Sequence, residues 1–285
     1  MSRIVYVNGV YLPEEEATVS IFDRGFLFAD GVYEVSSVLR GRLVDNQAHL
    51  RRLQRSLGEL EMASPASDSE IESIQCELIA RNEVTEGIVY LQVTRGAADR
   101  DFNYPEGVRP TLVMFTQRKR LIDNPQAEQG ISVITTPDIR WARRDIKTVG
   151  LLAPSMAKMI AKRAGADDAW MVENGHITEG SSNNAYIVTR EGVIVTRQLG
   201  NEILHGITRQ AVLKLASEAQ LKIEERPFTV DEAHVAKEAF ITSASTFVMP
   251  VVKIDGIPVG KGEPGPVSKQ LREFYIAAAL ADIEE

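Results

Sequence analysis

Within the stretch "RWARRDIKTVGLLAPSMAK", residues 140–158, one lysine, Lys147, stands among apolar side chains. Those neighbours are Ile146, Val149, Leu151 and Leu152. Partial removal from water disfavours an ammonium group relative to the neutral amine, which is a nucleophile that condenses with aldehydes. The alternative is a side chain that reaches solvent or pairs with Asp145. The stretch makes Lys147 a candidate catalytic residue and leaves a structural role open.

The composition is that of a soluble globular protein. The chain has 285 residues, of which 44% are hydrophobic and 25% charged, enough for one large domain or two smaller ones. A net charge of −8 disfavours binding to nucleic acid or to an anionic membrane surface. Residues 1–16 lack the apolar core of a signal peptide, so we expect a cytoplasmic protein. The single cysteine, Cys76, is expected to be buried in a helix.

The first part of the chain predicts a domain of hairpins and helices. Asn8-Gly9 and Arg40-Gly41 suit hairpin turns, and further strands are expected over 87–96 and 109–117. Leucines at 50, 53, 57 and 60 predict one helix, and a second is expected over 68–81. The charged, proline-containing stretch that follows predicts a linker at 119–128. The N-terminal α+β domain is therefore expected over 1–118.

The remainder, 129–285, predicts a larger domain of mixed α and β structure. Strands are expected over 131–137, 168–172, 184–189, 192–196, 238–243 and 247–254. Helices are expected over 155–165, over 207–219 and at the C-terminus, where Leu271, Phe274, Tyr275 and Ala278 form one stripe. The fold class is α+β in two domains.

Three polar motifs in the second domain are candidates for ligand binding. "HITEGSSNN" (176–184) is expected to be a loop in which Glu179 could hold a heteroaromatic nitrogen protonated. "LHGITR" (204–209) suits a helix start whose free N–H groups bind an anion, aided by Thr208. "FITSAS" (240–245) offers further hydroxyl and N–H groups after a strand. Each motif alone is also compatible with an ordinary turn or helix cap.

Taken together, these motifs resemble a known family. "DGVYE" (30–34), "VTRG" (93–96), "RDIK" (144–147), "TEGSSNN" (178–184), "GITR" (206–209) and "TSAS" (242–245) occur in the order found in the class IV aminotransferases. These are pyridoxal 5′-phosphate enzymes of fold type IV, and the chain is most similar to their D-amino-acid aminotransferase branch. The resemblance runs almost from end to end, and the joint occurrence of six motifs is far more specific than any one.

The resemblance implies roles in cofactor binding and catalysis. Lys147 matches the lysine that binds the cofactor covalently and then moves the substrate's Cα proton, and Glu179 the acid that pairs with the pyridinium nitrogen. Arg52 matches the phosphate-binding arginine, which could fork onto phosphate through two N–H groups. The remaining cofactor-binding positions are Leu204, packed against the ring, and Ile207, Thr208, Ser243 and Ala244 near the phosphate. Ala244 replaces a phosphate-binding threonine of the family, so only its backbone N–H is available.

The substrate loop departs from the family. The resemblance implies that Tyr33 and Arg100 bind the substrate carboxylate, but the position of a family histidine is occupied by Phe102. Arg100 can still grip a carboxylate through two N–H groups. We therefore expect α-amino acids as substrates, and Phe102 is hypothesised to favour a bulkier or more apolar side chain than that of D-alanine.

The resemblance implies a cytoplasmic homodimer that converts D-amino acids and 2-oxo acids in two half-reactions through pyridoxamine phosphate, with D-alanine and 2-oxoglutarate giving pyruvate and D-glutamate. The loop bearing Arg100 is expected to serve the partner's site. Alternatives within the fold are branched-chain aminotransferases, (R)-selective amine transaminases and aminodeoxychorismate lyase. A catalytically silent binding module on the same scaffold is disfavoured because the lysine, acid and arginine are all present.

Two other kinds of chemistry have weaker support. Ser155 and Lys158 fit the S-x-x-K pattern of serine acyl enzymes, but the remaining motifs of that class are missing, and Ser155 is expected to begin a helix. The four histidines show no metal-ligand spacing, so no metal site is predicted and each is expected to be a surface or packing residue.

Overall fold

The computed structural model describes residues 2–282, which form two compact units. The first contains residues 2–120 together with Ile146–Gly150, and the second contains Leu121–Asp145 and Leu151–Ala281. No local pattern indicated that Ile146–Gly150 would return to the first unit. The predicted linker at 119–128 includes the start of a short helix, α4 (Pro125–Gln129), which packs on a strand of the second unit.

The first unit is built on one antiparallel sheet of six strands, in the order β2-β1-β6-β5-β3-β4. Its strands are β1 (Ile4–Val7), β2 (Val10–Pro13), β3 (Gly31–Leu39), β4 (Arg42–Val44), β5 (Glu86–Thr94) and β6 (Thr111–Arg118). Both predicted hairpin turns are confirmed. Asn8 and Gly9 have φ of 48° and 102°, and Arg40 and Gly41 have φ of 50° and 75°, values that two-residue turns of this kind require.

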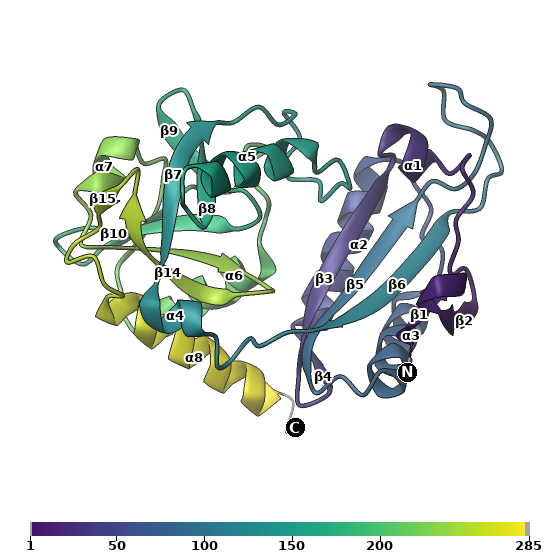
Figure 1. Cartoon of the computed structure of the whole chain (residues 1–285), viewed down its shortest axis with the longest axis horizontal. Coiled ribbons are helices and arrows are strands. Elements are labelled where there is room, and N and C mark those ends of the chain that lie inside the picture. Colours follow the sequence, from purple (N-terminus) through teal and green to yellow (C-terminus); the bar gives the residue numbers. More distant parts are fainter. Residues whose placement is uncertain (1, 283–285) are drawn as a thin grey trace. The chain divides into compact units, whose positions relative to one another are not determined.

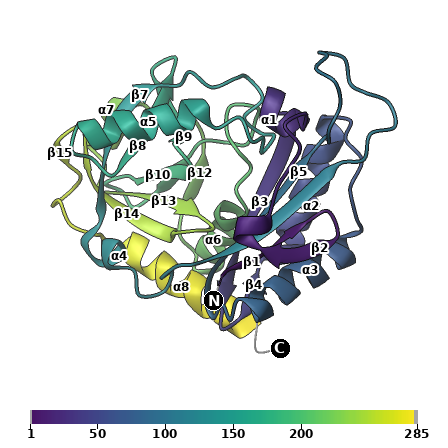
Figure 2. The same ribbon diagram turned by 45° about the vertical axis from the view of Figure 1, so that its right-hand side comes forward.

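Two helices, α2 (Asn46–Glu59) and α3 (Asp68–Arg81), cover one face of this sheet (Figures 1 and 2). The predicted leucine stripe of α2 is buried there at Leu50, Leu53 and Leu57. A capping box between Ser67 and Glu70 starts α3. The expected burial of Cys76 is wrong, because the buried face of α3 carries its neighbour Gln75 and leaves the cysteine exposed. The remaining short helices are η1 (Glu14–Glu16) and α1 (Arg24–Phe28).

Strand β3 presents different chemistry to its two sides, because successive side chains of a strand alternate between faces. Glu34 points to the side of α2, where it contacts residues of that helix. Tyr33 points to the other side and stacks on Tyr90, at 5.5 Å between ring centroids, and Tyr90 stacks on Phe115 at 4.7 Å. An aromatic row therefore crosses the sheet on the face opposite α2.

The segment Ile146–Gly150 is attached to the edge of β3 by backbone hydrogen bonds. The N–H of Tyr33 donates to the carbonyl of Lys147 at 3.0 Å, and the N–H of Val149 donates to the carbonyl of Gly31 at 3.0 Å. Val32 and Thr148 form an antiparallel bridge between them. The backbone of Lys147 is thus fixed to the sheet of the first unit.

The second unit contains a mixed sheet of nine strands, in the order β12-β11-β10-β13-β14-β7-β8-β9, with β15 paired to β14. They are β7 (Ile131–Pro137), β8 (Asp168–Glu173), β9 (His176–Gly180), β10 (Asn184–Val188), β11 (Ile194–Thr196), β12 (Ile223–Glu225), β13 (Glu238–Ser243), β14 (Phe247–Ile254) and β15 (Ile257–Pro258). The six predicted strands are all present. The loop expected around Glu179 is wrong, because residues 176–180 form β9, antiparallel to β8.

The helices of this unit are α4, α5 (Leu152–Arg163), α6 (Ile207–Glu218), α7 (Val230–His234) and α8 (Pro266–Asp282). Both views place α5 and α8 on opposite sides of the unit (Figures 1 and 2). Of the stripe predicted for the terminal helix, Leu271 and Tyr275 are buried, and Tyr275 packs on Phe247. Across residues 2–282, no helix combines the length and apolar character needed to cross a membrane.

Candidate active site

Lys147 is half-buried, with its ammonium nitrogen 4.3 Å from the centroid of the Tyr33 ring. The apolar enclosure expected from the sequence is only partly present. Ile146 is buried, but Leu151 and Leu152 are 39% and 75% exposed. The face of an aromatic ring, rather than the leucines that follow in the sequence, is therefore the environment of the lysine nitrogen.

Arg52 of α2 directs its guanidinium at a buried carboxylate. Its Nε donates to Oε1 of Glu34 at 2.8 Å and its Nη2 donates to Oε2 at 2.7 Å. The two-pronged grip predicted for phosphate is thus made on Glu34, because β3 places that carboxylate directly beneath α2.

The same carboxylate also contacts His49, whose Nδ1 lies 2.7 Å from Oε2 of Glu34. Glu34, His49 and Arg52 are all buried. Burial alone would raise the pKa of Glu34, but the ion pair with Arg52 and the hydrogen bonds from Arg52 and His49 lower it to about 2. His49 was expected to be only a surface or packing residue, and instead it is part of this buried polar cluster.

The loop that carries Arg100 and Phe102 is anchored at several points of the first unit. Arg24 donates from Nη1 to the carbonyl of Asp101 at 2.6 Å, and the guanidinium of Arg95 lies 3.5 Å from the centroid of the Tyr104 ring. Arg24 and Arg95 also share the carboxylate of Asp30.

Arg100 is placed against aromatic rings. Its guanidinium lies 5.3 Å from the ring centroid of Phe28 and 5.5 Å from that of Phe102, and the two rings meet edge to face at 5.6 Å. Such contacts favour a cation held over the ring faces. The residue that replaces the family histidine is therefore in contact with the arginine that follows the "VTRG" motif.

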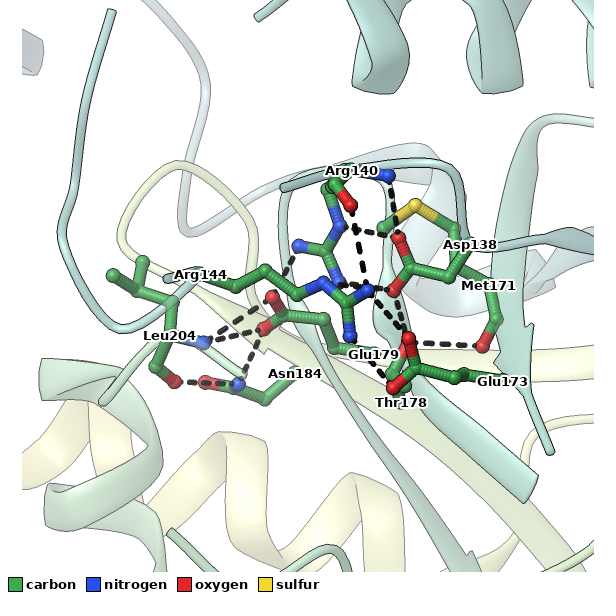
Figure 3. A network of polar contacts seen from close by, with 9 residues as sticks. All are labelled: Asp138, Arg140, Arg144, Met171, Glu173, Thr178, Glu179, Asn184 and Leu204. Atoms are coloured by element: carbon green, nitrogen blue, oxygen red, sulfur yellow. Dashed lines mark hydrogen bonds and ion pairs between the residues drawn. The ribbon is translucent and has the colours of Figure 1, made fainter. Parts of the chain in front are cut away.

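In the second unit, Glu179 is buried at the end of β9 and is surrounded by hydrogen-bond donors (Figure 3). Arg140 donates from Nη1 to Oε1, Asn184 donates from Nδ2 to Oε2 at 2.9 Å, and the N–H of Leu204 lies 3.2 Å from both oxygens. Burial raises the pKa of Glu179, while the charge and hydrogen bond of Arg140 and the N–H of Leu204 oppose that rise.

Arg140 belongs to a chain of alternating charges that continues away from Glu179 (Figure 3). Its Nε and Nη2 grip the carboxylate of Asp138 at 2.9 and 2.7 Å, and its backbone N–H donates to the same group at 3.1 Å. Nε of Arg144 lies 3.6 Å from Asp138, and both terminal nitrogens of Arg144 bind Glu173. The Arg140 guanidinium therefore contacts two carboxylates, that of Glu179 on one side and that of Asp138 on the other.

Next to Glu179, helix α6 begins without a side-chain cap. Its N-cap is Gly206, and Ile207 and Thr208 occupy the first turn, as predicted. A side chain at Gly206 would meet the side-chain amide of Asn184, the residue that also bonds Glu179, so a larger residue here would require Asn184 to move. Backbone N–H groups at such a helix start are suited to an anion such as phosphate.

The turn after β13 is next to β10, because β13 pairs with β10 in the sheet. Asn184 of β10 pairs with Thr242 of β13, and the hydroxyl of Ser243 lies 2.7 Å from that of Thr246. Ala244 follows in the same turn. The second unit thus gathers the predicted acid, helix start and hydroxyl turn around the edge formed by β9, β10 and β13.

Sequence reasoning missed three residues that contact the predicted ones: Glu34, Arg140 and Asn184. Glu34 and Asn184 stand inside the motifs "DGVYE" and "TEGSSNN", and Arg140 is seven residues before Lys147 in the same stretch of sequence. Their positions were visible, but their partners were not, because Arg52 and Glu34 are 18 residues apart and Arg140 and Glu179 are 39 apart.

The residues proposed for a serine acyl enzyme have another arrangement. Lys158 pairs with Asp168 at 3.1 Å, and Ser155 lies inside α5, which begins three residues earlier than expected. Within residues 2–282, no three His, Cys, Asp or Glu side chains gather where they could hold a metal ion.

The fold and these two sets of residues define a class of enzyme. Residues 31–254 match the family model described as amino-transferase class IV, and the chain belongs to this family. Two curated relatives are named D-alanine aminotransferase. The protein of Bacillus licheniformis is 41% identical over 280 residues, 98% of each chain. That of Staphylococcus aureus strain MSSA476 is 38% identical over 274 residues, 95% of this chain and 96% of that one.

Solved structures agree on the fold. The branched-chain amino acid aminotransferase of Escherichia coli has a TM-score of 0.91 at 23% identity and covers 98% of this chain and 95% of its own. The corresponding enzyme of a T.th. strain, solved with pyridoxamine 5′-phosphate, has a TM-score of 0.90 at 27% identity and covers 98% and 94%. The predicted family and the two-domain α+β architecture are confirmed.

Pyridoxal 5′-phosphate is the cofactor of this family, and the residues present fit it. A buried carboxylate ringed by donors suits a protonated ring nitrogen, and the uncapped start of α6 suits a phosphate. A lysine fixed by its backbone supplies an amine for an aldehyde. Each of these groups, taken in its own unit, therefore matches one chemical requirement of the cofactor.

Proposed function

We propose that this chain transfers the amino group of D-amino acids to 2-oxo acids, with pyridoxal 5′-phosphate as cofactor. The observation that carries the proposal is the buried Glu179, which meets N–H donors from Arg140, Asn184 and Leu204 beside the uncapped start of α6. Relatives named D-alanine aminotransferase, aligned over nearly the whole chain, support the choice of substrate.

Lys147 has two tasks in this proposal. When bound, the cofactor supplies an aldehyde that condenses with amines and a ring that draws electrons away from the substrate's Cα. Lys147 would hold the cofactor at this aldehyde through its Nζ, and the same Nζ, when free, would be the group that accepts and returns the substrate's Cα proton. The backbone bonds to β3 keep this nitrogen in place throughout.

The remaining cofactor-binding residues are assigned to the ring nitrogen, to the ring face and to the phosphate. Glu179 holds a proton on the ring nitrogen, which strengthens the electron withdrawal. Leu204 packs against the ring. Phosphate is bound by Arg52 and by the groups that follow: Ile207, Thr208, Ser243 and the backbone N–H of Ala244.

Tyr33 and Arg100 are proposed to bind the substrate carboxylate. The aromatic contacts of Arg100 with Phe28 and Phe102 support a guanidinium that is already oriented before substrate arrives. We also propose that the enzyme is a cytoplasmic homodimer in which this loop serves the partner's site. Exposed apolar side chains on the first unit, Phe22, Phe26, Phe102 and Tyr104, support an interface there.

A spectrophotometric screen tests the substrate class. The purified enzyme is given D-amino acids, L-amino acids and (R)-amines, each with 2-oxoglutarate or pyruvate, and product oxo acid is followed. We expect turnover with D-amino acids and a kcat/KM at least about 100-fold lower with the L-enantiomers, a difference of about 3 kcal/mol. Preferential turnover of branched L-amino acids or of (R)-amines would replace this proposal by one of the other transaminases of the fold.

Truncating Phe102 tests its role in side-chain preference. Because Phe102 is 78% exposed and contacts Phe28 and Arg100 at the surface, Phe102→Ala removes apolar surface without opening the core. We expect kcat/KM for large apolar D-amino acids to fall about tenfold relative to D-alanine. Val10→Ala, at a site that is 59% exposed and not among the interface residues named above, is the matched control. An unchanged ratio in Phe102→Ala would exclude this role.

A further inference from the structure

We propose that Arg140 is a positioning residue that keeps the Glu179 carboxylate ionised and oriented, and that Asp138 fixes Arg140 for this purpose. The inference rests on the proposed role of Glu179 and extends it. Among the described residues, the charged groups around Glu179 are Arg140 from the loop after β7, Asp138 at its start and, beyond them, Arg144 with Glu173 (Figure 3).

The two sides of the Arg140 guanidinium contact different carboxylates. Nε and Nη2 are used on Asp138, and Nη1 is used on Glu179. A planar guanidinium cannot turn while two of its nitrogens are gripped, so Nη1 stays aimed at Oε1 of Glu179. Asp138 is itself fixed by the hydroxyl of Thr178 at 2.7 Å, and Thr178 directly precedes Glu179 on β9.

Charge explains why such a group is needed. Glu179 is 3% exposed, and a buried carboxylate takes up a proton unless a positive charge or donors stabilise the anion. Asn184 and Leu204 supply neutral donors, whereas Arg140 supplies a full charge in direct contact. A protonated Glu179 could not hold a proton on a ring nitrogen. Loss of Arg140 therefore removes the function of Glu179, although the Glu179 side chain itself is unchanged.

The experiment measures protonation of Glu179 directly as well as activity. The carboxyl band of Glu179 is followed by infrared titration of the full-length protein, with and without bound cofactor, and is assigned by its loss in Glu179→Gln. In Arg140→Gln we expect the pH of half-protonation to rise by about 1–3 units. At neutral pH we expect kcat to fall about tenfold or more, with a smaller change in KM.

Two variants separate charge from packing. Arg140→Lys keeps the charge and should leave the half-protonation pH within about one unit of wild type. Asp138→Asn should shift it in the same direction as Arg140→Gln but less. Arg226→Gln is the control, because Arg226 also pairs with two carboxylates, Glu224 and Glu232, but is 39% exposed and contacts neither Asp138 nor Glu179.

An unchanged half-protonation pH in a folded Arg140→Gln protein would overturn the proposal, as would an equal shift in Arg226→Gln. Folding is verified by circular dichroism, and Asp138→Asn provides the measurement if Arg140→Gln does not fold. The titration without cofactor does not depend on the reaction catalysed. A failure of the proposed function would therefore appear in the substrate screen and leave this result intact.

Discussion

Replacing Lys147 with alanine is expected to lower kcat for D-amino acid transamination by about 10⁴-fold or more, because we propose that the same nitrogen binds the cofactor and moves the proton. The fold should survive, since the segment is held to β3 by backbone bonds that alanine retains. The absorbance band of covalently bound cofactor should disappear as well. Initial rates of oxo acid formation and the visible spectrum measure both effects.

The matched control for this variant is Lys158→Ala. Lys158 is an exposed lysine of α5 paired with Asp168, and it belongs to the S-x-x-K pattern of the acyl-enzyme alternative. We expect Lys158→Ala to retain both the band and wild-type kcat. Ordinary transamination in Lys147→Ala would refute the assignment of Lys147. A loss of activity in Lys158→Ala but not in Lys147→Ala would instead support the serine acyl-enzyme mechanism.

Replacing Glu34 with glutamine is expected to cost about 3 kcal/mol of folding free energy at neutral pH. The substitution keeps the shape of the side chain but leaves the buried guanidinium of Arg52 without its opposing charge. Urea unfolding followed by circular dichroism measures the loss. Glu77→Gln, in the exposed pair with Arg81, should change stability by less than about 1 kcal/mol.

The same pair predicts a pH dependence. The pKa of Glu34 is about 2 in the folded protein against an ordinary value of 4.5, so the unfolded chain binds the proton more tightly. The stability that Glu34 contributes is therefore complete above pH 4.5 and is lost as the pH falls from 4.5 toward 2. Glu34→Gln should lack this part of the acid dependence. Parallel stability curves for the two proteins in acid would contradict the assignment.

Local signals in the sequence were sufficient for many elements of the fold. Helix α3 begins where predicted because Ser67 and Glu70 form a capping box, and it ends at Arg81, as predicted. The hairpins at Asn8 and Arg40 follow from residues that tolerate positive φ. Strand β9 was missed although Asn174-Gly175 gives the same turn signal as Asn8-Gly9, because its polar residues are typical of a loop.

The candidate site was only partly predictable, for a different reason. Lys147 and Glu179 stand in motifs whose order is specific, so they could be singled out from the sequence. The partners of the site residues, Glu34 beneath Arg52 and Arg140 beside Glu179, depend on contacts between distant parts of the chain. Buried ion pairs leave no periodic pattern in a sequence, and only the folded structure pairs them.

The return of Ile146–Gly150 to the first unit has a consequence for protein engineering. The peptide that carries Lys147 is encoded with the second half of the gene, yet its backbone is ordered by β3 in the first half. A chain cut after Arg120 would yield a fragment that contains Lys147 without the strand to which its backbone is hydrogen-bonded. The two halves of the chain therefore cannot be exchanged independently between relatives. An exchange requires that the edge of β3 in one half fits the Ile146–Gly150 segment of the other.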